Sequence, residues 1–261
     1  MLDIKDAVAV VTGGASGIGL AFARYWVQSG GKALLADVSG QALQSAQKAL
    51  GPSVETMACD VTSETDSQQL ADTAMGVFGK INLVAPFAGI IQDGLMVAPD
   101  RESGKVVSKM SLEQFRAVID VNLTGVFLTV RDCSEKMINN GDRGLICLVS
   151  STGSLGTAGQ INYSSSKAAV SVMPKVITAE FFRRGVADRI RCVAVAPGYV
   201  ATPILKGMNQ KALSRILENV PIGRLIEPAE VASLVCELYR NEAMTGDVYF
   251  IHGGLRLGSK G

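Results

Sequence analysis

Tyr163 and Lys167 are the two residues whose types and spacing point most directly to chemistry. On a helix that begins near Tyr163, Lys167 lies one turn later on the same face. An ammonium beside a phenol stabilises the phenolate and lowers its pKa from about 10, so the tyrosine can exchange a proton near neutral pH. Ser150 and Ser151 follow an apolar run upstream, and either hydroxyl could hydrogen-bond an oxygen on which charge develops. Tyr-x-x-x-Lys is also common on solvated helices, so the pair alone leaves both interpretations open.

A glycine-rich turn follows the first apolar segment of the chain. Its glycines have the spacing Gly-x-x-x-Gly-x-Gly, and an amphipathic run continues from them to Gln28. A strand, a glycine turn and a helix N-terminus together present backbone N–H groups to a pyrophosphate. Glycine also marks ordinary strand-to-helix turns, but an acidic residue about twenty positions later favours a dinucleotide. The turn residues expected to bind it are Gly13, Ser16, Gly17, Ile18 and Gly19.

Two aspartates follow the next two apolar strands. Asp37 comes directly after residues 32–36, where its carboxylate can accept hydrogen bonds from both hydroxyls of an adenosine ribose. Its charge would repel the extra phosphate of NADP, and neither arginine nor lysine lies in the glycine turn or just after Asp37, so we predict NAD as the cofactor. Asp60 and Val61 follow the strand at residues 54–58 and are expected near the adenine. Each aspartate could instead cap the helix that follows it.

Short apolar strands alternate with longer helices, and these elements must position the residues named above. The expected strands are Ala7–Val11, Lys32–Ala36, Val54–Ala58, Leu83–Ala85, Leu145–Val149, Ile190–Ala196 and Val248–Ile251. The expected helices are the run that ends at Gln28, then Gln41–Leu50, Thr65–Phe78, Leu112–Asn139, Tyr163–Arg183 and Pro228–Tyr239. This alternation predicts an α/β fold, a doubly wound parallel sheet of about seven strands with helices on both faces, in a single domain over residues 1–261.

Two long segments fall outside this alternation, and we expect both to be loops. They cover residues 91–110 and 198–212, and the second carries Pro203 and Gly207. Residues 91–110, the residues around 154–161 and a flap at residues 199–213 are rich in apolar side chains, which predicts the walls of a site for a cyclic, aliphatic or acyl substrate. The cofactor half of the domain is expected at about residues 1–150 and the catalytic and substrate half at about 150–261.

The composition of the chain excludes several classes of binding partner. Hydrophobic residues make up 48% of the chain and charged residues 19%, while 25 Lys and Arg against 24 Asp and Glu leave a net charge of +1. No basic run stands out, so neither nucleic acid nor a membrane surface is an expected partner. The five cysteines show no disulfide or metal spacing and predict reduced, buried thiols in a cytoplasmic protein without a metal site. His252 is the only histidine, which leaves little from which to build a serine–histidine triad, and no apolar run reaches the ~18 residues of a membrane span.

Taken in order, these features resemble the short-chain dehydrogenase/reductase family, and the likeness covers essentially the whole chain. It implies a Rossmann-type fold and an NAD(H)-dependent oxidoreductase that interconverts a secondary alcohol and a ketone. The residues that carry the likeness are Thr12-Gly13, Gly17-Ile18-Gly19, Asp37, Asp60-Val61, Ala88-Gly89, Asn122, Ser150, Tyr163, Lys167, Pro197-Gly198 and Thr202.

The resemblance also implies a role for each catalytic residue. Tyr163 would be the general acid/base, and Lys167 would hold the nicotinamide ribose and lower the pKa of Tyr163. The family serine lies thirteen residues before its tyrosine, which selects Ser150 over Ser151 to polarise the carbonyl. Asn122 would hold a proton-relay water, although an asparagine there could also kink or cap a helix. The further cofactor contacts that the resemblance implies are Ala88, Gly89, Pro197, Gly198, Val200 and Thr202, the last of which could instead be a cap before Pro203.

Two features of the chain depart from the common family pattern. Pro86 and Phe87 stand where the family usually has asparagine, so we expect Pro86 to end its strand and Phe87 to form an apolar wall. The segment between Gly89 and Asn122 is longer than usual, which is similar to type-II 3-hydroxyacyl-CoA dehydrogenases that also oxidise hydroxysteroids, and to bacterial secondary-alcohol dehydrogenases and ketoreductases. Lysines 105 and 109 of this insertion could meet a CoA phosphate or simply be solvated.

Assembly and two other functions complete the expectations. Family members are mostly tetramers or dimers, so a homotetramer or homodimer is expected. The His252-Gly253-Gly254 sequence is expected to form a turn after the last strand and to serve packing. A non-catalytic NAD-binding regulator or scaffold on the same fold is the alternative function, and a nucleotide-sugar epimerase, which shares Tyr-x-x-x-Lys, ranks third.

Overall fold

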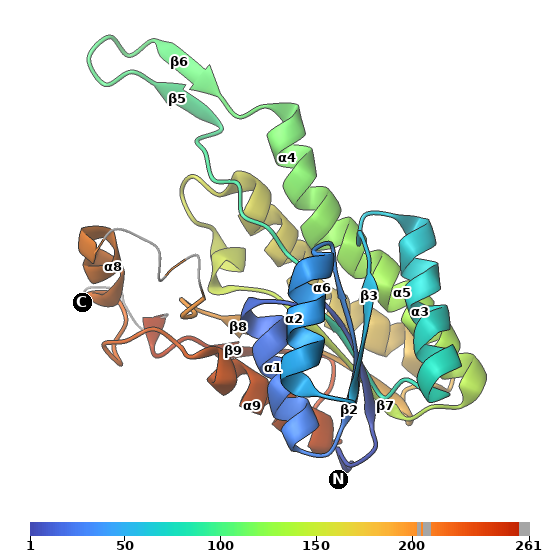
Figure 1. Ribbon diagram of the computed structural model, residues 1–261. Coiled ribbons are helices and arrows are strands. Elements are labelled where there is room, and N and C mark those ends of the chain that lie inside the picture. The colour runs from blue at the N-terminus through green and yellow to red at the C-terminus, as the bar shows by residue number, and fades with distance from the viewer. Residues whose placement is uncertain (203–204, 206–209, 256–261) are drawn as a thin grey trace.

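A seven-stranded parallel sheet forms the centre of the computed structural model, which describes residues 1–202, 205 and 210–255 (Figure 1). The strand order is β3-β2-β1-β4-β7-β8-β9, and every neighbouring pair is parallel. The central strands are apolar on both faces because helices cover both. The strands are β1 (Val8–Thr12), β2 (Lys32–Asp37), β3 (Val54–Ala58), β4 (Leu83–Pro86), β7 (Gly144–Val149), β8 (Ile190–Pro197) and β9 (Val248–Ile251).

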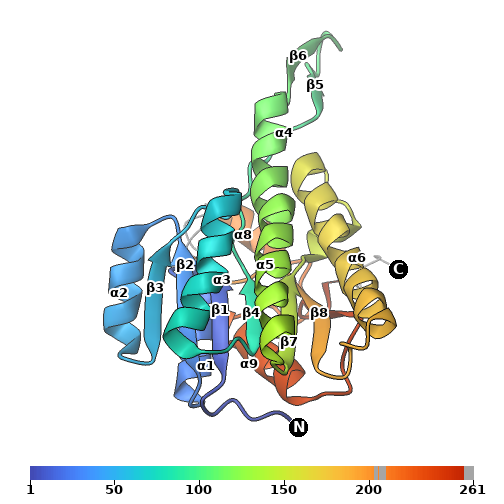
Figure 2. The same cartoon turned by 90° about the vertical axis from the view of Figure 1, so that its right-hand side faces the viewer.

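Two layers of helices enclose the sheet (Figure 2). One layer contains α1 (Gly17–Gln28), α2 (Gly40–Leu50) and α9 (Pro228–Arg240), and its core is centred on the fully buried Phe22 and Trp26. The other contains α3 (Glu64–Phe78), α4 (Leu112–Ile119), α5 (Gly125–Asn140) and α6 (Ile161–Arg183), with Leu70 and Val170 in its core. A short helix α8 (Gln210–Leu217) lies outside both layers.

Serine side chains begin three of these helices. The Ser39 hydroxyl accepts a hydrogen bond from the Ala42 N–H at the start of α2, and Ser63 and Ser111 do the same for α3 and α4. Asp37 is therefore not the cap of α2. Asp60 does not cap α3 either, because its carboxylate accepts from Thr62 within its own turn.

The predicted sheet is confirmed, with each expected strand beginning or ending within a residue or so of its prediction. The predicted helix at residues 112–139 is divided by a π-helical turn, Asp120–Thr124, between α4 and α5, which run nearly end to end. The expected loop at residues 91–110 contains an antiparallel hairpin of β5 (Val97–Pro99) and β6 (Val106–Lys109), which projects beyond the body of the molecule (Figures 1 and 2). Part of the loop at 198–212 belongs to α8, while Pro203 and Gly207 lie outside the described residues.

Two further expectations concern the state of the cysteines and the presence of membrane-spanning helices. All five cysteines are free and buried, and burial raises the pKa of the Cys59 thiol to about 11 and that of Cys236 to about 12. Such thiols stay protonated and unreactive near neutral pH. Within the described part of the chain, every helix is too short or too polar to cross a membrane.

Candidate active site

The candidate site lies at the carboxyl ends of the central strands. The strand order changes direction between β1 and β4, and a crevice forms at such a point in parallel sheets. Thr12 at the end of β1 pairs with Pro86 at the end of β4, and the Thr12 hydroxyl accepts a hydrogen bond from the Ala88 N–H at 3.3 Å. The glycine turn and the Ala88-Gly89 segment therefore face each other across this point.

The glycine turn is shaped by close packing and by backbone conformation. A Cβ on Gly13, whose φ is +63°, would lie 2.8 Å from the backbone of Ala88, and a Cβ on Gly19 would overlap the carbonyl of Gly13. Gly17 has a φ of +51°, and a Cβ there would meet only Thr202, at 3.7 Å. Gly13 and Gly19 are needed for close approach, and Gly13 and Gly17 for a left-handed backbone conformation.

The N-terminus of α1 suits an anion. Its N-cap is Ser16, whose side chain makes no capping hydrogen bond, and the first turn holds no acidic residue. The N–H groups at a helix start carry a partial positive charge and need an acceptor. Ile18, also expected here, packs its partly buried side chain against the core beneath α1, which leaves its backbone N–H at the helix start. The residues at this turn thus fit the pyrophosphate of a dinucleotide.

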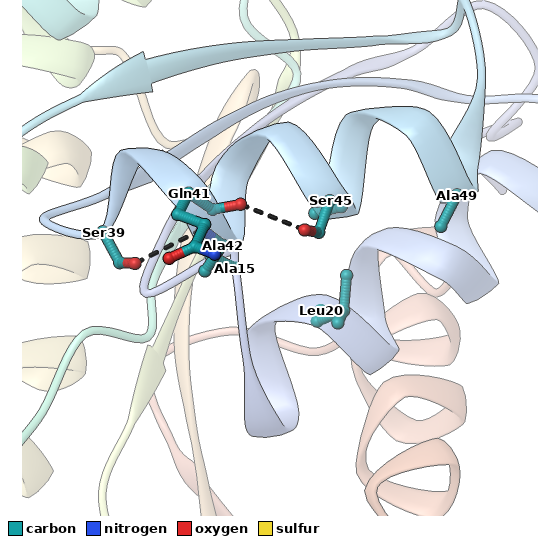
Figure 3. Close-up of a pocket in the computed structure, with 8 residues that line it drawn as sticks. Ala15, Leu20, Ser39, Gln41, Ala42, Ser45 and Ala49 are labelled. Atoms are coloured by element: carbon teal, nitrogen blue, oxygen red, sulfur yellow. Dashed lines mark hydrogen bonds between the residues drawn. The ribbon is translucent and has the colours of Figure 1, made fainter.

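Asp37 holds the glycine turn from the end of β2. One carboxylate oxygen accepts from the Ala15 N–H at 3.3 Å, and the other accepts from the Ser39 N–H at 3.1 Å. A carboxylate offers about four acceptor positions, so further donors such as ribose hydroxyls can be bound. A cavity of about 400 Å³ between α1 and α2 borders this corner and is lined by Ala15, Leu20, Ser39, Gln41, Ala42, Ser45, Ala46 and Ala49 (Figure 3).

The side chains expected near the adenine are close to the same edge of the sheet. Asp60 is exposed after β3, whereas Val61 is buried against Gly125 at the start of α5. A Cβ on Gly125 would lie 2.7 Å from the Val61 side chain, so the glycine permits this contact.

Lys167 is the buried cation of the site. Its side chain is 5% exposed, and its ammonium donates to the Val149 carbonyl at 2.8 Å and lies 5.8 Å from the centre of the Tyr163 ring. Burial lowers the pKa of Lys167 to about 8. A Cβ on Gly89 would lie 3.9 Å from this ammonium and 3.3 Å from the amide oxygen of Asn122, so the end of β4, the π-helical turn and α6 converge here.

Asn122 is fully buried in the π-helical turn between α4 and α5. Its amide oxygen accepts from the Ile90 N–H at 2.8 Å, and its amide nitrogen donates to the Ile90 carbonyl at 2.9 Å. π-Helical turns are frequent at functional sites because they re-aim one side chain. The π-helical turn that interrupts the helix is therefore also the element that positions Asn122. The two hydrogen bonds of Asn122 hold the backbone in place just after Gly89.

The pKa of Tyr163 is raised above its ordinary value. Burial is the largest cause, the negative charge of Asp93 adds to it, and a side-chain hydrogen bond with Ser151 acts in the opposite direction. The expected lowering is not met, because the loss of water around the phenol is the largest influence on the pKa of Tyr163. The phenol of Tyr163 therefore carries its proton at neutral pH.

The structure corrects which serine faces Tyr163. Extended backbone after β7 turns successive side chains to opposite sides. The Ser150 hydroxyl donates to the Lys167 carbonyl at 2.9 Å and lies 2.6 Å from the Ser171 hydroxyl, so it braces α6. Ser151 is the neighbour of the phenol: a Cβ on Gly153 would lie 3.3 Å from the Ser151 oxygen and 3.2 Å from the Tyr163 ring. Residue spacing alone did not reveal this, since it ignores the face on which each serine emerges.

The segment after β8 closes the site from the other side. Pro197 pairs with Ile251 at the end of the strand, and Val200 is buried. Gly198 permits close packing, since a Cβ there would lie 3.0 Å from the His252 side chain. His252 lies in the turn after β9, as predicted, where its ring accepts from the Gly254 N–H. Thr202 faces Gly17 of the glycine turn, across the crevice.

Pro86 and Phe87 fit without disturbing the site. Pro86 is the last residue of β4, as predicted, and the Phe87 ring packs edge-on against Phe22 at 5.6 Å between ring centres. Phe87 therefore extends the core under α1. No motif in the sequence marks three polar residues near Tyr163, which are Asp93, Gln160 and Asn162.

Comparison with known proteins agrees with this geometry. The short chain dehydrogenase family model matches residues 7–213, and the chain belongs to this family of oxidoreductases. It is 35% identical over 261 residues to the 3-hydroxyacyl-CoA dehydrogenase type-2 of Homo sapiens, with 97% of each chain covered. It is 33% identical over 257 residues to the 3-oxoacyl-[acyl-carrier-protein] reductase FabG of Thermotoga maritima, with 97% of this chain and 98% of the relative covered.

Proposed function

We propose that this protein is an NAD(H)-dependent oxidoreductase that interconverts a secondary alcohol and a ketone, with Tyr163 as general acid/base. The observation that carries the proposal is the convergence of Tyr163, Lys167 and Asn122 beside a glycine turn whose helix N-terminus suits an anion. A bound nicotinamide would supply the hydride chemistry.

The chain's own residues then handle the proton and the oxygen. In reduction, Tyr163 donates its phenolic proton to the oxygen of the ketone, and the Ser151 hydroxyl hydrogen-bonds the same oxygen. In oxidation, Tyr163 must first lose its proton, so oxidation becomes faster as the pH rises, and the raised pKa of Tyr163 moves this increase to higher pH. Lys167 has donors to hold a ribose hydroxyl, and Asn122 keeps the Gly89–Ile90 segment in position.

The preference for NAD over NADP rests on Asp37. Its carboxylate already binds the glycine turn through Ala15, so it stands where the adenosine ribose of a dinucleotide would lie. A 2′-phosphate at that position would be repelled. Asp37→Ala should therefore lower kcat/KM with NADH and raise it with NADPH, which compares the two cofactors within one pair of proteins.

The names of the two relatives suggest the first substrates to test. Both act on thioesters with an oxygen at the third carbon of an acyl chain, as their names state. We therefore place 3-hydroxyacyl and 3-oxoacyl thioesters ahead of hydroxysteroids and cyclic alcohols. A homotetramer or homodimer and a cytoplasmic location remain predictions. The non-catalytic alternative gains no support from Pro86 and Phe87, because both fit the fold.

The deciding experiment is a screen of 3-oxoacyl-CoAs, ketones and ketosteroids with NADH and, in parallel, with NADPH. We expect turnover with NADH and a loss of about a thousandfold in Tyr163→Phe, the range of a lost general acid, with NADH binding by fluorescence unchanged. Ser151→Ala should lose turnover, whereas Ser150→Ala should mainly lose stability. NADH binding without turnover of any compound, or an active Tyr163→Phe, would refute the proposal.

A further inference from the structure

The base of the insertion is hydrogen-bonded to the segment that leads into Tyr163. The Gly94 N–H donates to the Gly159 carbonyl at 2.8 Å, and Gly94 and Gln160 form an isolated parallel bridge. The Gln160 side chain adds a second contact, since its amide nitrogen donates to a carboxylate oxygen of Asp93 at 3.0 Å. These contacts lie three to four residues before the catalytic phenol.

A buried amide continues this connection to Tyr163 itself. Asn162 is fully buried, and its amide oxygen accepts from the Tyr163 N–H at 2.8 Å. Its amide nitrogen donates to the Gln92 carbonyl at 2.9 Å and to the Gln114 carbonyl of α4 at 3.4 Å. Gln114 in turn donates to the carbonyls of Gln92 and Asp93, each at 3.1 Å. One buried side chain therefore contacts the first turn of α6, the insertion and α4.

We propose that these contacts couple the position of the Tyr163 side chain to the position of the insertion. We call them the insertion clamp, which consists of Gln92, Asp93, Gln114, Gln160 and Asn162. The hairpin further along the insertion packs little against the body of the molecule, since all four residues of β6 are exposed. A substrate bound against the insertion then acts on the placement of the phenol through the clamp. The inference rests on the proposed function, and Asp93, Gln160 and Asn162 are positioning residues in it.

Asp93 acts on Tyr163 in two ways, through its hydrogen bond with Gln160 and through its negative charge, and two variants can separate these effects. The groups facing the Tyr163 phenol are Lys167 on α6, Asp93 on the insertion and the uncharged Ser151 after β7. The carboxylate of Asp93 raises the pKa of Tyr163. Asp93→Asn keeps an oxygen that can accept from Gln160 but removes this charge, whereas Asp93→Ala removes both.

The first test needs no turnover. Amide hydrogen exchange is measured over the first turn of α6, residues 161–166, in the wild type and three variants. Asp93→Ala should exchange about five times faster, the factor that corresponds to one lost hydrogen bond. Asp93→Asn should exchange like the wild type. Glu102→Ala, at the exposed tip of the hairpin, is the matched control and should also be unchanged. Equal exchange in Asp93→Ala and the wild type would overturn the clamp.

The second test measures reduction of a 3-oxoacyl-CoA with NADH as a function of pH. Asp93→Ala should lower kcat about fivefold. Asp93→Asn should keep kcat at its plateau. The alkaline limb of its pH–rate profile should move to lower pH, because the pKa of Tyr163 falls when the charge of Asp93 is removed. Loss of a hydrogen bond alone would not produce this shift. A wild type that reduces no compound refutes the proposed function but leaves the exchange result valid. An active wild type whose kcat and pH profile are matched by both Asp93 variants refutes the clamp.

Discussion

Two buried cations, one on helix α6 and one on strand β8, have different surroundings. Lys167 at the candidate site is 5% exposed, and Arg191 on β8, near the far end of α9, is 6% exposed. Among the residues that the structure describes, neither forms an ion pair with a carboxylate. They differ in how many of their hydrogen-bond donors are used.

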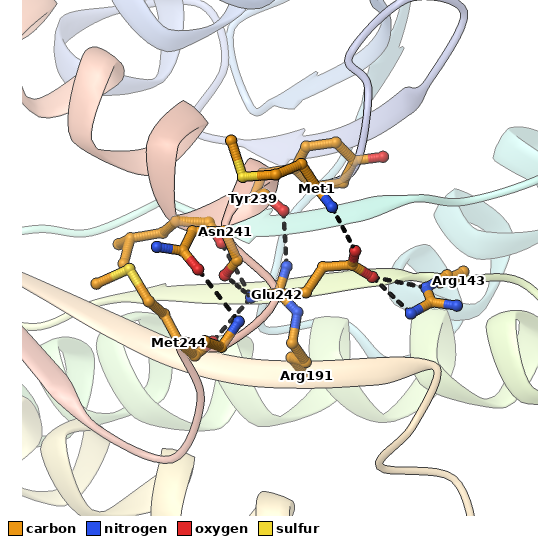
Figure 4. A network of polar contacts seen from close by, with 9 residues as sticks. Met1, Arg143, Arg191, Tyr239, Asn241, Glu242 and Met244 are labelled. Carbon is orange, nitrogen blue, oxygen red and sulfur yellow. Dashed lines mark hydrogen bonds and ion pairs between the residues drawn. The ribbon is translucent and has the colours of Figure 1, made fainter.

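Arg191 is held by four carbonyl groups through its two terminal nitrogens (Figure 4). Its guanidinium donates to the carbonyls of Leu238, Tyr239, Asn241 and Met244 at 2.7–3.0 Å, which satisfies the end of α9. Lys167 donates to the Val149 carbonyl, and its ammonium has three donors. The contrast teaches that a buried charge held by several carbonyl groups supports the fold, whereas one bound to a single carbonyl has donors left for a ligand.

The largest expected effect is on turnover, from Lys167→Met. This change keeps most of the side chain's volume and removes the ammonium, so no donor is left for a ribose hydroxyl near Tyr163. We expect kcat to fall at least a hundredfold. Urea unfolding should show no loss of stability near pH 7, because a poorly solvated charge has been removed. A substantial loss of stability would make Lys167 a structural residue like Arg191 and break the comparison.

Arg191→Met should give the converse result. It leaves four carbonyls without a donor at the end of α9, and we expect the free energy of unfolding to fall by about 4 kcal/mol. Turnover per folded molecule should stay within about twofold of the wild type, because Arg191 lies at the start of β8, whereas the site borders the carboxyl end of this strand. Arg191→Lys is the matched control and should lose less, since an ammonium still offers three donors. A variant as stable as the wild type would contradict the structural role.

How far the sequence predicts these roles depends on burial. The strands were predictable because apolar runs such as residues 190–197 are buried on both faces, and the lone arginine inside that run marks a charge that must find partners. The glycine turn and the Tyr163–Lys167 pair were likewise predictable from spacing. The hairpin was missed because β6, with all four residues exposed, carries no alternation of apolar and polar side chains.

Two other predictions were wrong: which serine faces Tyr163, and whether the pKa of Tyr163 is raised or lowered. Spacing selected Ser150, but which of two adjacent serines faces α6 depends on where β7 ends and on the face from which each side chain emerges. The direction of the Tyr163 pKa shift was also missed, because it is set by how much water the fold removes from the phenol. Both the orientation of the serines and the burial of the phenol depend on the whole fold, so the residues of the motif alone do not determine them.

A smaller effect concerns stability as a function of pH. The pKa of Lys167 is about 8 in the folded protein and about 10.5 in the unfolded chain, so the folded state binds fewer protons between these values. Stability then rises with pH in this window, by an amount that approaches about 3 kcal/mol. The difference in unfolding free energy between wild type and Lys167→Met, measured from pH 7 to 10.5, should shift in favour of the wild type. Parallel curves for the two proteins would show that the ammonium is well solvated.

The smallest effect is expected beside Arg191, at the exposed end of the same network. Glu242 pairs with the N-terminal ammonium of Met1 at 2.9 Å and with Arg143, and these cations lower the pKa of its carboxyl group (Figure 4). Because the pKa is lowered in the folded state, the stabilisation is present above the ordinary pKa of glutamate and is lost as the pH falls through the folded value. Glu242→Gln should lower the urea midpoint only slightly at neutral pH, and the difference should vanish in acid and in high salt, since exposed pairs are screened. Turnover should not change. A loss as large as that of Arg191→Met would mean that the carboxylate is needed to hold the guanidinium, and that the carbonyl groups alone do not hold it.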